Sequence, residues 1–231
     1  MKPKFGVVVF PGSNCDHDAY YVTKKLLDCD TEFLWHKESN LKNSDIIILP
    51  GGFSYGDYLR TGAIARFSPI MESVINFAEK GGIVLGICNG FQILIEANLL
   101  PGSLIKNSST KFICKDIFVK VVNSRTTLTA DLPKSVLKIP IAHGEGNYFI
   151  DDEGLKTLKQ NNQIIFQYCD TNGNIEEEFN PNGSLENIAG IMNKSGNVFG
   201  MMPHPERSSD EVLQKSDGIL LFKSLINNIT I

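Results

Sequence analysis

Residues 86–90 (GICNG) place Cys88 between two glycines. An apolar run at 83–85 precedes this segment, and a helix-like stretch at 91–97 follows it. Glycines on both sides permit the tight strand-to-helix turn of a nucleophile elbow, which projects its central side chain into a cleft. The first N–H groups of the following helix and its positive dipole end favour the thiolate form of a cysteine. The pattern therefore predicts that Cys88 is a nucleophile.

A cysteine nucleophile needs a base, and the base needs a third group that orients it. The chain has four histidines. We expect His17 and His36 at the surface, because they lie in or near the first strand–helix unit beside polar residues. His143 and His204 are the candidates, since a glutamate follows each of them two residues later. In an extended segment, residues i and i+2 share a face, so either pair can form an imidazole–carboxylate contact.

Prolines distinguish the two pairs. Pro203 and Pro205 flank His204 and restrict the backbone around it, whereas glycines follow His143 and leave its backbone freer. We therefore predict His204 as the base and Glu206 as the acid that orients it. The Pro-flanked pair alone is equally compatible with a structural turn, and its combination with the elbow favours the catalytic interpretation.

Acyl transfer also requires N–H donors for a developing oxyanion. Residues 50–53 (PGGF) follow a buried strand, at the sheet edge where the elbow also lies. We expect the backbone N–H groups of Gly52 and Asn89 to form the oxyanion hole. The alternative is that the glycines of this loop only turn the chain.

Alternating strand and helix patterns predict the fold that positions these residues. Apolar runs at 5–10, 33–35, 46–49 and 83–87 predict strands of a parallel sheet. The helical spacing of Ala19 and Val22 predicts a first helix. A second helix has Ser68 as its expected cap and Pro69 in its first turn.

The second half of the chain has a different pattern. Runs at 113–122, 139–142, 164–168 and 188–202 predict strands with hairpin connections, and a turn at 195–197 divides the last run. Residues 171–187 predict a polar loop, and Ser216 is expected to cap a final helix. We predict one α/β domain over residues 1–231, a flavodoxin-like three-layer fold whose mainly parallel sheet has an antiparallel extension.

Composition restricts the partners and the compartment. The formal net charge of -4, without a Lys/Arg block, predicts no nucleic-acid binding. No apolar run approaches the roughly 18 residues of a membrane span, and we expect a cytoplasmic protein. The five cysteines lack CxxC spacing, so we expect reduced thiols and no metal site.

Two distant motifs resemble a known family. Residues 86–92 (GICNGFQ) and 203–206 (PHPE) resemble the class I, triad-type glutamine amidotransferases. Within that group, residues 50–57 (PGGFSYGD), 60–66 (RTGAIAR) and 142–146 (AHGEG) are similar to the glutaminase subunits of phosphoribosylformylglycinamidine synthase. The similar stretches extend from residue 5 to residue 206, and so cover most of the chain.

The resemblance implies a reaction and its residues. Cys88 would attack the side-chain amide of L-glutamine, His204 would protonate the leaving ammonia, and Glu206 would orient His204. The glutamyl thioester would then be hydrolysed to glutamate. Gln92 would contact the glutamine substrate. The alternative is that Gln92 is only a residue of the helix surface. No cofactor is expected in this chain.

The family also implies partners. Ammonia would pass to a large synthetase subunit, which uses ATP and magnesium to make formylglycinamidine ribonucleotide for purine biosynthesis, and the family often adds a small third subunit. Residues 57–66, with Arg60 and Arg66, and the segment around His143 are candidates for partner contact or for lining an ammonia tunnel. An equal alternative is that Arg60 and Arg66 have a structural role and pair with surface carboxylates.

Other enzymes and proteins share the elbow. A cysteine peptidase or a redox-responsive chaperone is the alternative, and neither would need glutamine contacts or the Pro-flanked His204–Glu206 pair. A regulatory subunit with an inactive site is disfavoured, because all three residue types of the triad are present.

Overall fold

A nine-stranded sheet organises the molecule. The computed structural model describes residues 2–57, 60–213 and 216–229. In the order in which they lie across the large sheet, its strands are β2 (Thr31–Trp35), β1 (Phe5–Val9), β3 (Ile46–Leu49), β4 (Ile83–Ile87), β11 (Val198–Met201), β10 (Ile188–Met192), β9 (Ile164–Cys169), β6 (Ile113–Val121) and β7 (Val136–His143). A separate two-stranded sheet pairs β5 (Ser103–Ile105) with β8 (Asn147–Phe149).

The helices are α1 (Asp16–Tyr20), α2 (Pro69–Glu79), α3 (Asn89–Glu96), α4 (Asp152–Gln160) and α5 (Asp217–Asn228). A π-helical stretch, Tyr21–Leu26, continues α1. Short 3₁₀ segments occupy Ser54–Asp57, Ala65–Phe67, Glu177–Phe179, Leu185–Asn187, Pro205–Ser208 and Glu211–Leu213. Among the described residues, no helix has both the length and the apolar character needed to cross a bilayer.

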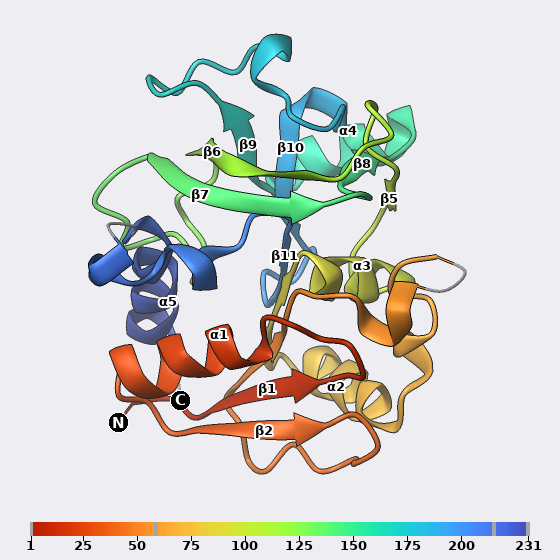
Figure 1. Cartoon of the computed structure of the whole chain (residues 1–231), viewed down its shortest axis with the longest axis vertical. Coiled ribbons are helices and arrows are strands. Elements are labelled where there is room, and N and C mark those ends of the chain that lie inside the picture. The colour runs from red at the N-terminus through yellow and green to blue at the C-terminus, as the bar shows by residue number, and fades with distance from the viewer. Residues whose placement is uncertain (1, 58–59, 214–215, 230–231) are drawn as a thin grey trace.

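The sheet has a parallel half and an antiparallel half. Strands β2, β1, β3, β4 and β11 run parallel to one another, and β10, β9, β6 and β7 continue the sheet in antiparallel pairs. Figure 1 shows the antiparallel strands at the opposite end of the molecule from β1 and β2. This arrangement confirms the predicted fold class.

The parallel half brings the expected site residues to one edge. Leu49 pairs with Gly86 and Ile87 pairs with Met201, so β3, β4 and β11 end side by side. The segments that leave these carboxyl ends contain the 50–53 loop, Cys88 and His204. Because ligands of open α/β sheets bind at this edge, the topology alone predicts a site there.

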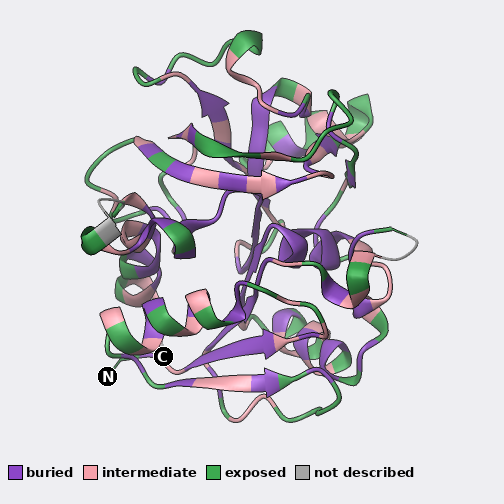
Figure 2. Cartoon of the chain, in the orientation of Figure 1, coloured by how far each residue is buried: buried purple, intermediate pink, exposed green. Residues whose placement is uncertain are grey.

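Burial follows the position of each strand in the sheet. Every residue of β3 and β4 is buried, which matches their continuous apolar sequences IIIL and IVLGI. Figure 2 shows the same burial along most of β1. A strand that is covered on both faces has a continuous apolar sequence. In β7 and in the second half of β6, by contrast, buried residues alternate with more exposed ones. The core therefore lies around the strands that carry Cys88 and His204.

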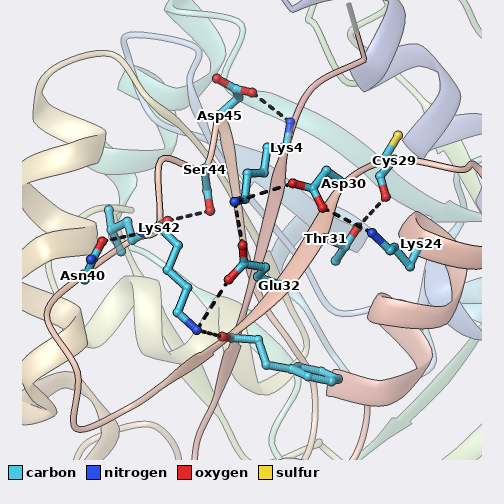
Figure 3. A network of polar contacts seen from close by, with 12 residues as sticks. Lys4, Lys24, Cys29, Asp30, Thr31, Glu32, Asn40, Lys42, Ser44 and Asp45 are labelled. Carbon is cyan, nitrogen blue, oxygen red and sulfur yellow. Dashed lines mark hydrogen bonds and ion pairs between the residues drawn. The ribbon is translucent and has the colours of Figure 1, made fainter.

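Charged side chains cover the edge strand β2. Glu32 pairs with Lys4 at 2.6 Å and with Lys42 at 3.6 Å, and Asp30 pairs with Lys24 at 3.2 Å (Figure 3). Surface ion pairs contribute little stability individually. Their effect at this position is to disfavour the pairing of β2 with a strand of another molecule.

Several sequence predictions need correction. Ser68 and Ser216 precede α2 and α5, but neither side chain makes a capping hydrogen bond in the described part of the chain. The Ser68 hydroxyl instead lies 2.9 Å from the Tyr55 hydroxyl. The sequence reading predicted neither α4, which has a low mean hydropathy and is capped by Asp151, nor the sheet of β5 and β8. The turn within 188–202 is confirmed, with Gly196 at φ 74°.

Candidate active site

Cys88 occupies a strained turn between β4 and α3. Its φ and ψ are 50° and -105°, a combination that a non-glycine residue seldom adopts. The flanking glycines are required by close packing: a Cβ at Gly90 would lie 1.9 Å from the Leu49 oxygen, and one at Gly86 would lie 2.7 Å from the Gly90 oxygen. The local geometry is that of a nucleophile elbow.

The edge strand β7 holds the backbone of His204. The His204 N–H donates to the Pro140 oxygen at 2.8 Å, and the Ser208 hydroxyl donates to the Lys138 oxygen at 3.0 Å. The segment that follows β11 therefore runs along β7 and uses carbonyl groups that an edge strand leaves free.

His204 and Glu206 form a buried pair. Their Nδ1 and Oε1 atoms are 2.6 Å apart, and the two side chains are 2% and 0% exposed. Burial alone would lower the pKa of His204, but the Glu206 carboxylate and then the Cys88 sulfur raise this pKa well above its ordinary value. The Nε2 atom makes no hydrogen bond to another described residue. The contact expected for residues i and i+2 is present in this pair, but Glu206 lies in the 3₁₀ segment Pro205–Ser208 and not in the expected extended one.

His143 has a different environment. Its Nδ1 donates to the Asn107 Oδ1 at 3.0 Å, and its Nε2 lies 3.5 Å from the Asn182 Nδ2. Burial lowers the pKa of His143 to about 4. A neutral imidazole that donates from Nδ1 and faces an amide donor at Nε2 is poorly suited to act as a base. The Glu145 carboxylate, in turn, accepts a hydrogen bond from the Thr61 hydroxyl at 2.8 Å.

A cavity of about 230 Å³ opens beside Cys88. It is smaller than the roughly 300–1,000 Å³ of drug-sized ligand pockets, and so it suits a small substrate. The residues that line it are Gly52, Phe53, Asp57, Thr61, Cys88, Gln92, Phe112, Ala142, His143, Gly144 and Glu145. A larger cavity of about 660 Å³ adjoins the end of α3 and α4, and none of the predicted site residues lines it.

Side-chain amides connect the elbow to the cavity wall. Gln92, in the first turn of α3, donates from Nε2 to the Glu145 backbone oxygen at 2.6 Å and accepts from the Asn89 Nδ2 at 3.3 Å. The Ser54 hydroxyl donates to the Asn89 Oδ1. Gln92 is 5% exposed, so it is a buried member of the wall and not a residue of the helix surface.

The wall carries two neighbouring carboxyl groups. Burial and the negative charge of Glu145 raise the pKa of Asp57 to about 6. The Asp57 Oδ1 is buried and has no hydrogen-bond partner among the described residues.

The two expected oxyanion donors, Gly52 and Asn89, occupy different positions relative to Cys88. Gly52 lines the cavity at φ 140°, and a Cβ there would lie 2.4 Å from the Asn14 nitrogen, so only glycine fits. Asn89 begins α3 directly after Cys88, where the first N–H groups of a helix have no partner within the helix.

The two arginines of 57–66 make surface contacts outside the cavity. Arg60 pairs with Glu96 of α3 at 2.7 Å, which is the carboxylate pairing that the sequence left open. The Arg66 guanidinium lies 4.8 Å from the centre of the Phe67 ring. Residues 58 and 59 of this segment lie outside the described part of the chain.

One histidine prediction was wrong. His17 is exposed as expected, but His36 is only 4% exposed. Its Nδ1 lies 2.7 Å from the Tyr55 hydroxyl, and burial lowers its pKa. The polar residues that follow His36 suggested a surface position, although the 54–57 segment covers the ring.

Sequence reasoning missed two residues near the site. Cys15 follows β1, another strand of the parallel half, and its Sγ lies 3.8 Å from the His204 Nδ1. The same rule that selected the 50–53 loop could have found it. Asn182 lies in the polar loop 171–187, is fully buried, and donates to the Gly146 oxygen at 2.8 Å. No local pattern distinguishes it from the exposed residues of that loop.

Comparison with known proteins gives one consistent result. Residues 2–219 match the family model of the CobB/CobQ-like glutamine amidotransferase domain. A protein of Salinibacter ruber named phosphoribosylformylglycinamidine synthase subunit PurQ is 52% identical over 100% of this chain and 99% of its own length. A protein of Chlorobium chlorochromatii with the same name is 56% identical over 97% of each chain.

A solved structure agrees with these relatives. A chain of the structure of PurLQS from Thermotoga maritima superposes with a TM-score of 0.85 and 44% identity, over 98% of this chain and 99% of that one. The chain described here therefore belongs to the class I glutamine amidotransferases, and within them to the glutaminase subunits of phosphoribosylformylglycinamidine synthase.

Proposed function

We propose that Cys88, His204 and Glu206 hydrolyse L-glutamine to glutamate and ammonia. The Cys88 sulfur attacks the side-chain amide carbon, and His204 gives a proton to the departing nitrogen, which leaves as ammonia. A γ-glutamyl thioester remains on Cys88. Water, activated by His204, then attacks the thioester carbon and releases glutamate together with the free thiol.

The arrangement of His204 is the observation that carries this proposal. Its Nδ1 is engaged by Glu206 at 2.6 Å, which leaves Nε2 free of hydrogen bonds to other described residues. A base with one nitrogen oriented by a buried carboxylate and the other available is the arrangement that a triad requires. His143 has contacts at both ring nitrogens.

The remaining site residues support the acyl-transfer steps. The backbone N–H groups of Gly52 and Asn89 stabilise the oxyanion of each tetrahedral intermediate. Gln92 binds the glutamine substrate from the cavity wall, where it also fixes the backbone at Glu145. We assign no metal or cofactor to this chemistry.

The ammonia is used by a partner. We infer that this chain associates with a large synthetase subunit, which carries ATP and magnesium and makes formylglycinamidine ribonucleotide, and that a small third subunit joins them. The name of the Thermotoga maritima structure, PurLQS, supports a complex of this kind. Arg60, Arg66 and the region of His143 are candidates for partner contact or for the ammonia path.

We expect the reaction to take place in the cytoplasm. The five cysteines are free thiols in the structure, and Cys88 has to stay reduced to act as a nucleophile. A reducing compartment meets this requirement.

The test measures glutamate release from glutamine, with and without the synthetase subunit and ATP. Wild-type protein should release glutamate and form a trapped glutamyl-enzyme that mass spectrometry detects. The variants Cys88→Ala and His204→Ala should form no such adduct, whereas His143→Ala should form it and mainly weaken coupling to synthesis. If Cys88→Ala releases glutamate at the wild-type rate, the assignment of the nucleophile is wrong.

A further inference from the structure

Cys15 lies against the catalytic pair without a role in the reaction described above. It is 1% exposed, and its Sγ is 3.8 Å from the His204 Nδ1. The donor atoms of Cys15, His204 and Glu206 all lie within 4.8 Å of one another. The thiol therefore borders the His204–Glu206 hydrogen bond itself.

The backbone fixes the position of this thiol. The N–H groups of Asn14 and Cys15 both donate to the Gly51 oxygen, at 3.3 and 3.2 Å. A Cβ at Gly51 would lie 2.6 Å from the His204 Cε1 and 3.3 Å from the Cys15 Sγ. The Gly51 backbone, the thiol and the imidazole edge are thus packed together, with no room for a methyl group.

The chemistry of a buried thiol suits this position. Burial raises the pKa of Cys15, so the group stays neutral and adds no charge beside Glu206. The Glu206 Oε2 is buried and has no hydrogen-bond partner among the described residues. A weak S–H donor near this carboxylate offers little competition to the strong His204 contact.

We propose that Cys15 is a positioning residue for His204: its thiol fills the space beside the His204–Glu206 pair, keeps water out, and holds the imidazole in its catalytic orientation. The proposal rests on the proposed role of His204 as the proton carrier. A smaller side chain would leave a gap bordered by polar atoms, which a water molecule can occupy. That water would compete with His204 for the Glu206 carboxylate.

The experiment compares Cys15→Ala and Cys15→Ser with Cys29→Ala, a matched control. Cys29 is also a buried thiol, 2% exposed, and its Sγ contacts the Leu27 oxygen at 3.7 Å, away from the triad. Glutamine hydrolysis is measured with the synthetase subunit present, across a range of pH. We expect Cys15→Ala to lower kcat about tenfold and to leave KM within about twofold of wild type. Cys15→Ser should recover only part of the rate, because its hydroxyl refills much of the gap but donates to the Glu206 carboxylate more strongly than a thiol does.

The pH profile separates positioning from stability. The Cys15 contact raises the pKa of His204, so Cys15→Ala should move the acidic limb of kcat/KM to lower pH, and Cys29→Ala should leave it unchanged. The imidazole signals of His204 in ¹⁵N-labelled protein should shift in Cys15→Ala under conditions in which the variant is folded. If Cys15→Ala matches Cys29→Ala in kcat, pH profile and His204 signals, the proposal is wrong. An active Cys88→Ala variant would instead contradict the proposed function.

Discussion

The backbone N–H of Cys88 donates to the Met201 oxygen at 2.7 Å, and so joins Cys88 to the strand that leads to His204. This hydrogen bond continues the parallel pairing of β4 with β11, in which Ile87 faces Met201. The spacing of the proposed nucleophile and base therefore depends on the register of β4 with β11 and on the hydrogen bond that holds the His204 N–H to Pro140 of β7. A site built on rigid elements keeps its geometry better than one built on loops.

Replacing the second elbow glycine should destabilise the protein strongly. In Gly90→Ala the new methyl group would lie 1.9 Å from the Leu49 oxygen, a backbone atom of a fully buried strand. We expect the free energy of unfolding to fall by about 3 kcal/mol or more. Urea denaturation measures this change. In the control variant Gly144→Ala the nearest atom is Phe112 Cδ2 at 3.8 Å, and stability should change little. Equal stability of the two variants would contradict the packing argument.

The parallel half was predictable because its signals are local. Continuous apolar runs mark β1, β3 and β4, and the glycines around Cys88 mark the elbow. The same rule placed the 50–53 loop and the elbow at one sheet edge. The Pro-flanked His204 was selected by its restricted backbone, and the structure adds the hydrogen bond to Pro140 that holds it.

The remaining features depend on tertiary contacts. His36 is buried because a segment about twenty residues later covers it, although the residues that follow it in the sequence are polar. Helix α4 buries only Leu158, so its apolar signal is weak. Cys15 and Asn182 reach the site from distant parts of the chain. The sheet-edge rule could have found Cys15, whereas no local pattern marks Asn182.

His143 should make stability depend on pH. The unfolded chain takes up a proton at this residue near pH 6.5, whereas burial keeps it neutral in the folded protein down to about pH 4. Because the pKa of His143 is lower in the folded protein, protonation favours the unfolded chain. The free energy of unfolding therefore has its full value above pH 6.5 and decreases as the pH falls towards 4. The loss is on the order of 3 kcal/mol. Urea denaturation at pH 7.5 and pH 5 measures about 2 kcal/mol of this loss, because pH 5 lies about 1.5 units below the unfolded pKa.

The variant His143→Gln isolates this contribution, because it removes the titrating group. Its stability should fall less between pH 7.5 and pH 5 than that of wild type. His17→Gln is the control, since the His17 side chain is 83% exposed and should not alter the difference. A His143→Gln variant with the full wild-type loss would assign the pH dependence to other groups.

Asp217 should stabilise the strand that holds His204. Its Oδ2 accepts from the Lys138 N–H of β7 at 2.7 Å, and its Oδ1 pairs with Lys134 at 2.6 Å. We expect Asp217→Ala to lower the free energy of unfolding by about 1–2 kcal/mol, because the backbone donor loses its charged partner. Lys134→Met removes only a half-exposed ion pair and should cost less than about 0.5 kcal/mol. Thermal or urea unfolding of both variants measures these changes. A larger loss of stability in Lys134→Met than in Asp217→Ala would contradict this interpretation.

Phe67 and Arg66 should contribute to binding the synthetase subunit. The Phe67 ring is 77% exposed, and the Arg66 guanidinium lies 4.8 Å from its centre. Exposed aromatic and arginine side chains are the types that most often dominate protein interfaces. We expect Phe67→Ser to raise the Kd for the synthetase about tenfold, and to leave thioester formation by the isolated chain unchanged, since Phe67 does not line the cavity beside Cys88. Val212→Ser is the control for loss of an apolar surface residue, because Val212 is 88% exposed in another segment. Calorimetry with the purified synthetase measures the Kd of each variant. If Phe67→Ser binds the synthetase as tightly as Val212→Ser does, the partner surface lies elsewhere.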